Sequence, residues 1–238
     1  MLARRSAAVV SPQADHLRRR RAPRGSGILL RDEILDAATE LLLETGHAKA
    51  MSIRSVAERV GVTPPSIYLH FLDKDTLLDA VCARYFEKLD EEMQRVSAGA
   101  PSRLEVLRAQ GLAYVRFATE TPELYRIATM GEWRSGSNVD AALASSAFEH
   151  MHATIQALMD EGICPPGDAT TVALELWSTA HGVASLLIAK PHLPFGHAEE
   201  FAERVLSAMF CGHIVTGMVG PNATPQQIVE WLMKRSQA

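Results

Sequence analysis

Residues 52–75, SIRSVAERVGVTPPSIYLHFLDKD, contain the clearest structural pattern in the chain. Ser52 precedes a short amphipathic stretch that ends at Gly61, and glycine is the residue best suited to the left-handed conformation that closes a helix. Thr63 then precedes two prolines, which fit the first turn of a helix because N–H groups there have no partner within the helix. The Thr63 hydroxyl is expected to cap that turn. The pattern therefore predicts two short helices joined by a tight turn, with the second helix ending near residue 71.

A longer helix is expected immediately before these two. Apolar residues recur with helical spacing from Ile34 to Leu42, and Gly46 follows them as a second helix-closing glycine. Two short helices joined by a tight turn, with a third helix packed behind them, form the geometry that places one helix in the major groove of DNA. Six apolar side chains are expected to form the core of this unit: Val56, Ala57, Val60, Val62, Ile67 and Phe71.

The polar side chains of the same stretch then face outward and are candidate DNA contacts. Tyr68 and His70 can donate hydrogen bonds to phosphate oxygens, and the hydroxyl groups of Thr63 and Ser66 can reach phosphates or base edges. Structural alternatives stay open, because Tyr68 can simply pack and a serine at a helix start can simply cap it. Leu69 can meet a thymine methyl group or be an ordinary exposed leucine. The predicted DNA-binding residues are Ser52, Arg54, Thr63, Ser66, Tyr68, His70 and Lys74.

This stretch resembles the DNA-binding domain of the TetR/AcrR family of regulators, and the likeness covers residues 28–78. The family pattern is matched at Val56-Ala57, Gly61-Val62-Thr63, Tyr68-Leu69-His70-Phe71, Lys74-Asp75 and Leu77. The resemblance implies contact with DNA at five positions: Ser52, Thr63, Tyr68, His70 and Lys74. One departure is Pro65, which stands where many members have glycine, so a backbone N–H that could reach a phosphate is missing.

From residue 75 onward no strand pattern is visible and the start signals are helical. Ser102 with Glu105 forms a capping box, and Thr224 precedes a first-turn proline. We predict an all-α protein with an N-terminal three-helix helix-turn-helix domain and a larger helical ligand-binding and dimerisation domain. The later helices are expected near residues 75–97, 102–120, 122–130, 140–161, 168–190, 198–219 and 225–235. The expected domains are a disordered basic arm at 1–27, a helix-turn-helix DNA-binding domain at 28–74 and a helical effector-binding and dimerisation domain at 75–238.

Two short stretches that begin at Pro122 and Trp177 resemble a branch of the same family whose C-terminal domain carries a Trp-x-x-x-His-Gly signature. Trp177 and His181 share one helix face, and Gly182 leaves room for another helix to approach closely. The resemblance implies that the last two long helices pack against their counterparts in a second copy, which makes a homodimer. Broad apolar faces suit such an interface. They contain Leu174, Ala180, Val183, Leu187, Val205, Ala208, Met209 and Ile214.

Large apolar and aromatic side chains of the second domain indicate a chamber for a ligand. Such residues at helical spacing are also typical of an ordinary core, and that alternative stays open for each of them. The partner expected in the chamber is a small apolar or amphipathic effector. The predicted ligand-binding residues are Tyr114, Phe117, Tyr125, Met130, Trp133, Phe148, Met151, Trp177 and His181.

Composition limits the classes of function. The net charge is −4, yet seven arginines precede Ile28, so contact with a polyanion has to be confined to the N-terminal end. Three widely spaced cysteines indicate neither disulfides nor a metal site, which predicts a cytoplasmic protein. Residues 171–189 are apolar, but Glu175 and His181 near their middle favour a buried helix over a membrane span.

The sequence carries none of the common catalytic motifs, such as a Gly-x-Ser-x-Gly elbow or a His-Glu-x-x-His zinc helix, so no enzyme, cofactor or metal is expected. We predict a ligand-responsive regulator, a repressor released by a small molecule from a palindromic operator in double-stranded DNA. Two alternatives are a non-specific architectural DNA-binding protein and an all-helical enzyme. Activation in place of repression stays open, as do the effector and operator. The basic arm either strengthens DNA binding in a salt-sensitive way or has no role.

Overall fold

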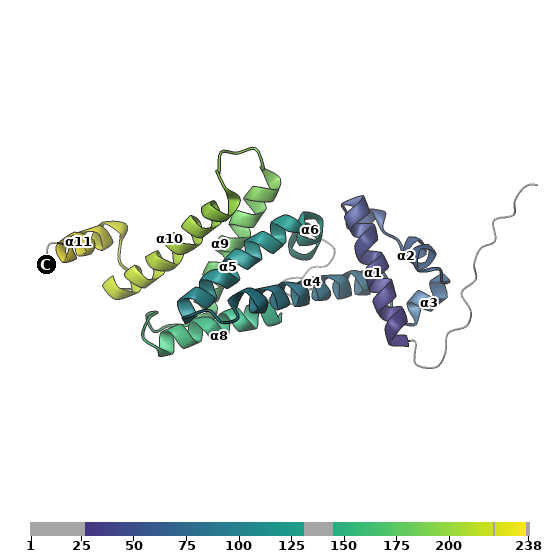
Figure 1. Cartoon of the computed structure of the whole chain (residues 1–238), viewed down its shortest axis with the longest axis horizontal. Helices are drawn as coiled ribbons and strands as arrows, with labels where there is room; N and C mark the ends of the chain where they lie inside the picture. The colour runs from purple at the N-terminus through teal and green to yellow at the C-terminus, as the bar shows by residue number, and fades with distance from the viewer. Residues whose placement is uncertain (1–26, 131–144, 221, 237–238) are drawn as a thin grey trace, which may run out of the picture.

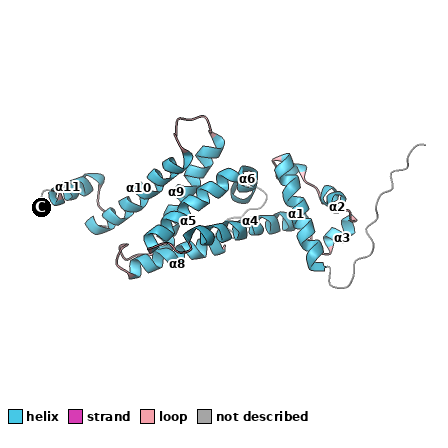
Figure 2. Ribbon diagram, in the orientation of Figure 1, coloured by secondary structure: helices cyan, strands magenta, loops and turns pink. Residues whose placement is uncertain are grey.

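The computed structural model describes residues 27–130, 145–220 and 222–236. Every regular element in these ranges is a helix, as Figure 2 shows, and this confirms the predicted all-α class. The helices form two parts in Figure 1. A small three-helix unit lies at one end of the molecule, and a larger bundle follows it.

The small unit, called the DNA-binding unit below, contains α1 (Gly27–Thr45), the short 3-10 helix η1 (Ala48–Ala50), α2 (Ile53–Val60) and α3 (Pro64–Tyr68). A capping box between Ser52 and Ser55 begins α2, and Gly61 ends it with φ 76°, a left-handed conformation that favours glycine. The core of the unit is closed by buried side chains from all three long elements and the segment after them: Ile34, Leu35, Ala38, Leu42, Val56, Ala57, Ile67 and Phe71.

Two local predictions in this unit were wrong, and one short element was not predicted. Helix α3 ends at Tyr68, three residues before the expected end, because the N–H groups of His70 and Phe71 both turn back to the carbonyl of Ile67. The Thr63 hydroxyl does not cap α3; it lies 3.1 Å from the Ser66 hydroxyl instead. The third difference is η1, which has no periodic signal because it is only three residues long.

The larger bundle begins with α4, which leaves the DNA-binding unit and runs along the bundle (Figure 1). The Asp73 side chain caps α4 by accepting a hydrogen bond from the N–H of Thr76 at 2.7 Å. Helix α5 lies at the centre, where it contacts α4, α8, α9 and α10. The elements are α4 (Lys74–Ser97), α5 (Arg103–Glu120), α6 (Pro122–Met130), α8 (Ser146–Asp160), α9 (Ala169–Ala189), α10 (Ala198–Val219) and α11 (Pro225–Arg235).

These bounds agree with the predicted ones within one residue, with one exception. The helix expected at 140–161 is observed as α8, whose N-cap Ser145 accepts a hydrogen bond from the N–H of Phe148. The earlier part of that expected helix lies outside the described residues. Local cap chemistry therefore placed the ends of most helices correctly.

Helices α9, α10 and α11 expose apolar surface. Among the described helices, α9 is the one long and apolar enough to cross a membrane, and a third of its most apolar window is buried. Its Glu175 carboxylate lies 3.2 Å from the ring Nδ1 of His213 on α10, so this side chain contacts the neighbouring helix. Ala202 is the sole buried residue described on α10, and α11 has none. Helix α11 extends away from the bundle at the end opposite the DNA-binding unit (Figure 1).

Candidate DNA-binding surface and effector cavity

The two faces of α3 differ in polarity. Ile67 is fully buried in the core of the DNA-binding unit, whereas the Tyr68 side chain is 54% exposed. Thr63 is exposed and Ser66 is partly exposed, and their hydroxyls lie side by side at the start of the helix. The buried face fixes the helix, and the other face presents three hydroxyl groups to solvent. Such groups suit phosphate oxygens and base edges.

The structure places the other predicted DNA contacts around α3. Ser52 caps α2, so its hydroxyl has a structural role and is also exposed. Arg54 is highly exposed and pairs with Glu58 on its own helix at 3.0 Å, a contact weak enough to exchange for a phosphate. His70 and Lys74 are half-buried, just beyond α3 and at the first residue of α4.

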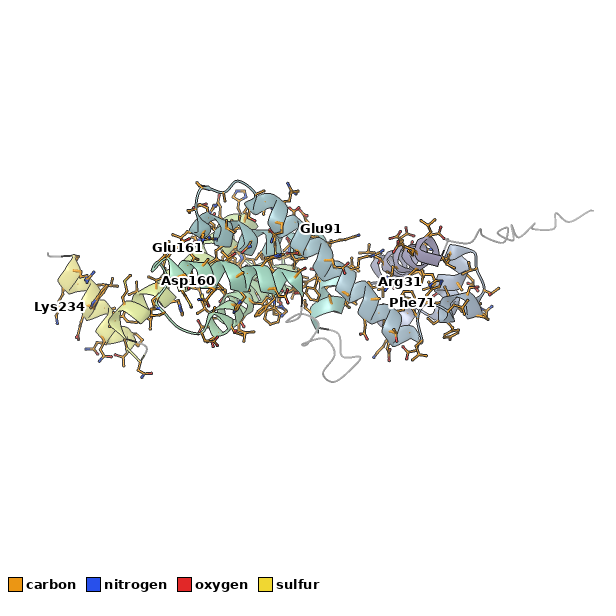
Figure 3. All side chains as sticks on the ribbon, turned by 90° about the horizontal axis from the view of Figure 1, so that it is seen from below. Arg31, Phe71, Glu91, Asp160, Glu161 and Lys234 are labelled. Atoms are coloured by element: carbon orange, nitrogen blue, oxygen red, sulfur yellow. The ribbon has the colours of Figure 1, made fainter. Side chains whose placement is uncertain are left out.

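Arg59 fixes α2 against α1. Its guanidinium donates to both carboxylate oxygens of Glu44, at 2.9 and 2.5 Å, and to Glu40 at 3.2 Å. Hydrogen bonds from Arg59 lower the pKa of the Glu44 carboxyl. On the other side of the unit, the Arg31 guanidinium lies 5.2 Å from the centre of the Phe71 ring (Figure 3). These contacts orient the helices behind the DNA-binding surface.

Two leucines on this surface have no core to pack into. Leu69, directly after α3, is 84% exposed, and Leu72 is 80% exposed. A single exposed leucine is ordinary, but this pair borders the polar side chains of α3. In a DNA major groove, the C5-methyl group of thymine is the apolar feature that such side chains can contact.

The larger bundle contains a cavity of about 110 Å³. It lies among α4, α5, α8, α9 and α10, so five helices that are distant in sequence each contribute part of its wall. Most of the lining is apolar. Aromatic rings come from all five helices. These are Phe86, Tyr114, Phe148, Trp177 and Phe210.

The predicted ligand-binding residues divide into three groups. Four of them line the cavity: Tyr114, Phe148, Met151 and Trp177. Three are placed beside it and do not line it: Phe117, which packs on Tyr85 with ring centres 5.1 Å apart, Tyr125 and His181. The Met130 side chain and Trp133 lie outside the described residues.

Tyr125 and His181 form a polar contact in the interior beside the cavity. The Tyr125 hydroxyl lies 2.8 Å from the ring Nδ1 of His181, 3.2 Å from the His181 carbonyl oxygen and 3.2 Å from the Ser185 hydroxyl. Trp177 lines the cavity, and the centre of its ring lies 5.5 Å from the centre of the His181 ring. The Tyr114 hydroxyl is 3.4 Å from the same Nδ1. This group joins α5, α6 and α9.

Burial keeps this network uncharged. It lowers the pKa of the His181 imidazole, so the neutral ring is favoured. Burial also raises the pKa of the Tyr114 and Tyr125 hydroxyls, so both keep their protons. The Nδ1 atom of the ring lies within hydrogen-bond distance of both tyrosine hydroxyls, and the Tyr125 hydroxyl donates to the His181 carbonyl oxygen. Hydrogen bonds between uncharged side chains therefore hold Tyr114, Tyr125 and His181 together, because burial disfavours their ionised forms.

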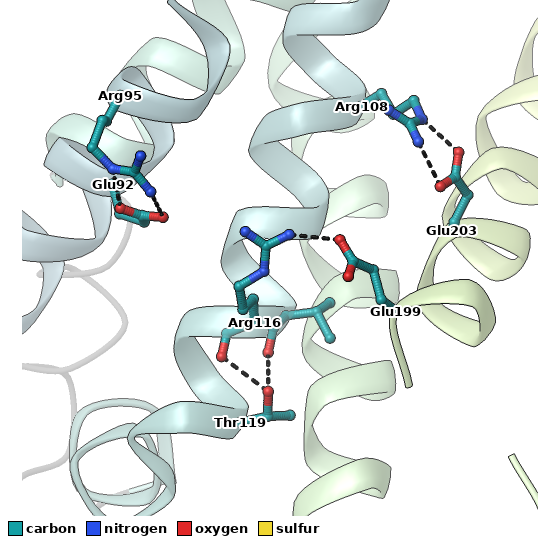
Figure 4. A network of polar contacts seen from close by, with 8 residues as sticks. Glu92, Arg95, Arg108, Arg116, Thr119, Glu199 and Glu203 are labelled. Atoms are coloured by element: carbon teal, nitrogen blue, oxygen red, sulfur yellow. Dashed lines mark hydrogen bonds and ion pairs between the residues drawn. The ribbon is translucent and has the colours of Figure 1, made fainter. Parts of the chain in front are cut away.

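Two ion pairs connect α5 to α10 at the edge of the bundle, as Figure 4 shows. Arg108 binds both carboxylate oxygens of Glu203, at 2.5 and 2.6 Å, and Arg116 donates to Glu199 at 2.6 Å. Arg108 and Glu203 also line the cavity. Because both are partly exposed, they stand between the cavity and solvent and neutralise each other there.

Gln110 is a cavity residue that the sequence reasoning missed. It lies on α5 and is only 2% exposed, and its side-chain oxygen Oε1 has no hydrogen-bond partner. The sequence contained a signal, because residue 110 follows Leu107 by three positions and precedes Tyr114 by four, which places a polar residue on an apolar helix face. In the described part of the chain, no group of three or more potential metal-binding side chains is found.

Two models of one protein family match the chain. Residues 34–81 match the model of bacterial regulatory proteins of the tetR family. Residues 107–209 match the model of the tetracyclin repressor-like C-terminal domain. The first match contains α2 and α3, and the second contains most of the cavity wall. Together they cover more than half of the chain.

Individual proteins show the same likeness. The tetracycline repressor protein class D of Escherichia coli is 42% identical over 53 residues, which are 22% of this chain and 24% of that protein, so the match spans about a quarter of that relative's length. The structure of a protein of unknown function from Rhodococcus sp. RHA1 is 26% identical, with a TM-score of 0.65 over 78% of this chain and 95% of that one.

A third likeness is to the transcriptional regulator FadR of Bacillus subtilis, solved in complex with stearoyl-CoA. It shares the fold, with a TM-score of 0.63 and 15% identity over 76% of this chain and 98% of that one. The narrower branch with the Trp-x-x-x-His-Gly signature stays a prediction. Because models of one family match both the DNA-binding unit and the larger bundle, the chain belongs to the tetR family of bacterial regulatory proteins.

Proposed function

We propose that this protein is a cytoplasmic, homodimeric transcriptional repressor that leaves its operator when a small apolar molecule fills the cavity. The observation that carries the proposal is the pairing of an exposed hydroxyl-bearing helix with a largely apolar cavity in one chain. A non-specific DNA-binding protein has no use for the cavity. An effector-binding protein without DNA has no use for the outward face of α3.

DNA binding is assigned to α3 and its surroundings. Thr63, Ser66 and Tyr68 provide hydroxyl groups on one exposed face, and His70 and Lys74 extend that face toward α4. These groups hold the phosphate backbone and orient the helix in the groove. The two prolines that begin α3 carry no N–H donor, so side chains supply the polar contacts at that end. Arg54 adds a phosphate contact when it leaves Glu58.

Dimerisation is assigned to α9 and α10. Gly182 and Gly212 both face open space, since an added Cβ at either position meets nothing within 4 Å. Leu186 and Met218 are exposed on the same two helices, at 49% and 57%. Ala180 and Val183 are buried inside the chain, so they belong to the bundle core and not to the face that a second copy would cover. The remaining faces are apolar and lightly charged, as permanent interfaces are.

Helix α6 is the proposed connection between the cavity and the DNA-binding unit. It contacts α1 and α4, and its Glu123 carboxylate approaches Gly46 at the end of α1. On its other side, Tyr125 binds His181, whose ring contacts the cavity residue Trp177. A ligand that displaces Trp177 therefore moves His181 and α6, and α6 changes the position of α1. Two DNA-binding units must match successive major grooves about 34–36 Å apart, so a small displacement weakens binding.

The test is a pair of titrations at one fixed salt concentration. An operator is first selected from random duplexes, and binding to it is compared with binding to a random duplex of equal length. We expect at least a thousandfold preference and two chains per operator. Equal affinity for both duplexes would instead indicate a non-specific architectural protein.

A conservative variant locates the contact. Tyr68→Phe removes one exposed hydroxyl and should lower operator affinity by about tenfold, because a hydrogen bond to a charged phosphate is lost. Tyr85→Phe makes the same chemical change at a tyrosine buried in α4 and should leave operator affinity unchanged. Equal losses in both variants would remove Tyr68 from the DNA-binding surface.

A further inference from the structure

Gln110 is the unusual group in the cavity. It is a buried polar residue in a cavity wall that is mostly apolar, and its Oε1 oxygen has no hydrogen-bond partner. A buried polar atom without a partner is costly, and in native proteins such atoms are usually satisfied by a protein group, a water molecule or a ligand. The oxygen is inaccessible even from the cavity, so a polar ligand atom reaches it once the Gln110 side chain turns toward the cavity that this residue lines.

The chemistry around Gln110 limits the ligand. The charged groups on the wall, Arg108 and Glu203, already neutralise each other through two hydrogen bonds. A carboxylate ligand has to compete with Glu203 for Arg108 or remain unpaired in an apolar cavity, and an unpaired buried charge is unfavourable. A neutral hydroxyl fits better. It can donate to the Gln110 oxygen and can equally accept from the Gln110 nitrogen, so it suits either orientation of the amide.

Size and shape narrow the class further. A cavity of about 110 Å³ is smaller than the cavity of roughly 150 Å³ that holds benzene in another protein, so a single ring is the largest group that it admits. Five aromatic side chains line it, and aromatic rings pack well against one another in edge-to-face or offset arrangements. An aromatic ring with one hydroxyl group therefore satisfies the volume, the walls and the orphaned amide together.

We propose that the effector is a neutral, single-ring aromatic alcohol whose hydroxyl group binds Gln110. This inference rests on the proposed function, since it names the ligand of the same regulatory cavity. Gln110 is the residue that distinguishes this ligand from an apolar ring of the same size. The Glu203 carboxylate competes with the corresponding carboxylate ligand for Arg108.

The experiment compares phenol, toluene and benzoate by calorimetry on the full-length protein without DNA. Wild-type protein should bind phenol and show no preference for benzoate. In Gln110→Met, which keeps the length of the side chain and removes the amide, the ratio of phenol to toluene affinity should fall by about tenfold. Gln156→Met, on the exposed side of α8, is the matched control and should leave the ratio unchanged. Thermal unfolding confirms that both variants fold.

Each other outcome overturns the ligand class. A phenol-to-toluene ratio unaffected by Gln110→Met means that Gln110 is satisfied in another way, and tighter binding of benzoate means that Arg108 opens to an anion. Absence of binding by all three probes also refutes it. A separate operator titration distinguishes the two proposals. If phenol binding depends on Gln110 but does not change operator affinity, the regulatory function alone is overturned. If a different molecule releases the operator, the ligand class alone is overturned.

Discussion

The DNA-binding unit and the cavity are built in opposite ways. The exposed face of α3 comes from a few consecutive residues, held by neighbouring buried side chains whose core continues into that of the larger bundle. The cavity takes its wall from five helices, and the contacts beside it join residues far apart in the chain, such as Tyr125 and His181, which are 56 positions apart. A local site depends on local packing, whereas the cavity depends on the arrangement of the whole bundle.

The difference has a consequence for how each site tolerates change. The DNA-binding surface needs its local core, its caps and the packing of α1 against α4 and α6, and the rest of the bundle brings a second copy of it to the DNA. The cavity has no comparable independent unit, because moving any one of α4, α5, α8, α9 or α10 changes its shape. Mutations should therefore abolish operator binding and spare ligand binding more easily than they abolish ligand binding and spare operator binding.

The largest effect is expected from Phe71→Ala. Phe71 is 2% exposed in the core of the DNA-binding unit, and its removal should destabilise that unit by about 3–5 kcal/mol. Operator binding should be lost while the cavity still binds its ligand, as calorimetry with and without DNA would show. Leu72→Ala, at an 80% exposed neighbour, should change stability by less than about 0.5 kcal/mol. Simultaneous loss of ligand binding in Phe71→Ala would contradict the independence of the two regions.

The next effect concerns the link between two copies. Gly182→Leu adds a side chain into open space on α9 and raises helix propensity, so the single chain should stay folded. It should prevent close packing of a second copy, convert dimer to monomer in sedimentation, and weaken operator binding by about a hundredfold through lost bivalency. Gly167→Leu also enters open space, in the turn before α9, and should remain dimeric. A dimeric Gly182→Leu protein would move the interface elsewhere.

A smaller effect should depend on pH. Burial lowers the pKa of His181 in the folded chain below its usual value near 6.5, so the unfolded chain binds a proton more readily. The neutral His181 ring therefore contributes fully to the free energy of unfolding above pH 6.5. This contribution is lost as the pH falls through the lowered pKa of His181 in the folded chain. His181→Gln should flatten the decrease in unfolding free energy below pH 6.5, measured by denaturant titration. His192→Gln, in the exposed turn after α9, should keep the wild-type slope.

The two regions also differ in what the sequence could predict. Helix ends followed local signals: Ser52, Asp73 and Thr224 each cap a helix near the expected position. Four predicted ligand residues do line the cavity, since aromatic and other large apolar residues on buried helix faces are easily recognised. The Arg108–Glu203 pair had no such signal, because its partners are 95 positions apart and meet only after α10 folds against α5. Sequence periodicity shows which face is buried, but not which distant helix covers it.

The smallest expected effect, on Lys74, tests the local site most directly. Lys74 begins α4 next to the exposed face of α3, and its ammonium group should neutralise one phosphate. Lys74→Ala should weaken binding to operator and random duplex alike, and should reduce the slope of log affinity against log salt by about 0.9 for each chain bound. Lys234→Ala removes the same charge from α11, which Figure 3 places at the far end of the molecule, and should leave the slope unchanged. A selective loss at the operator would show instead that Lys74 contacts a base, because a phosphate contact carries no sequence information.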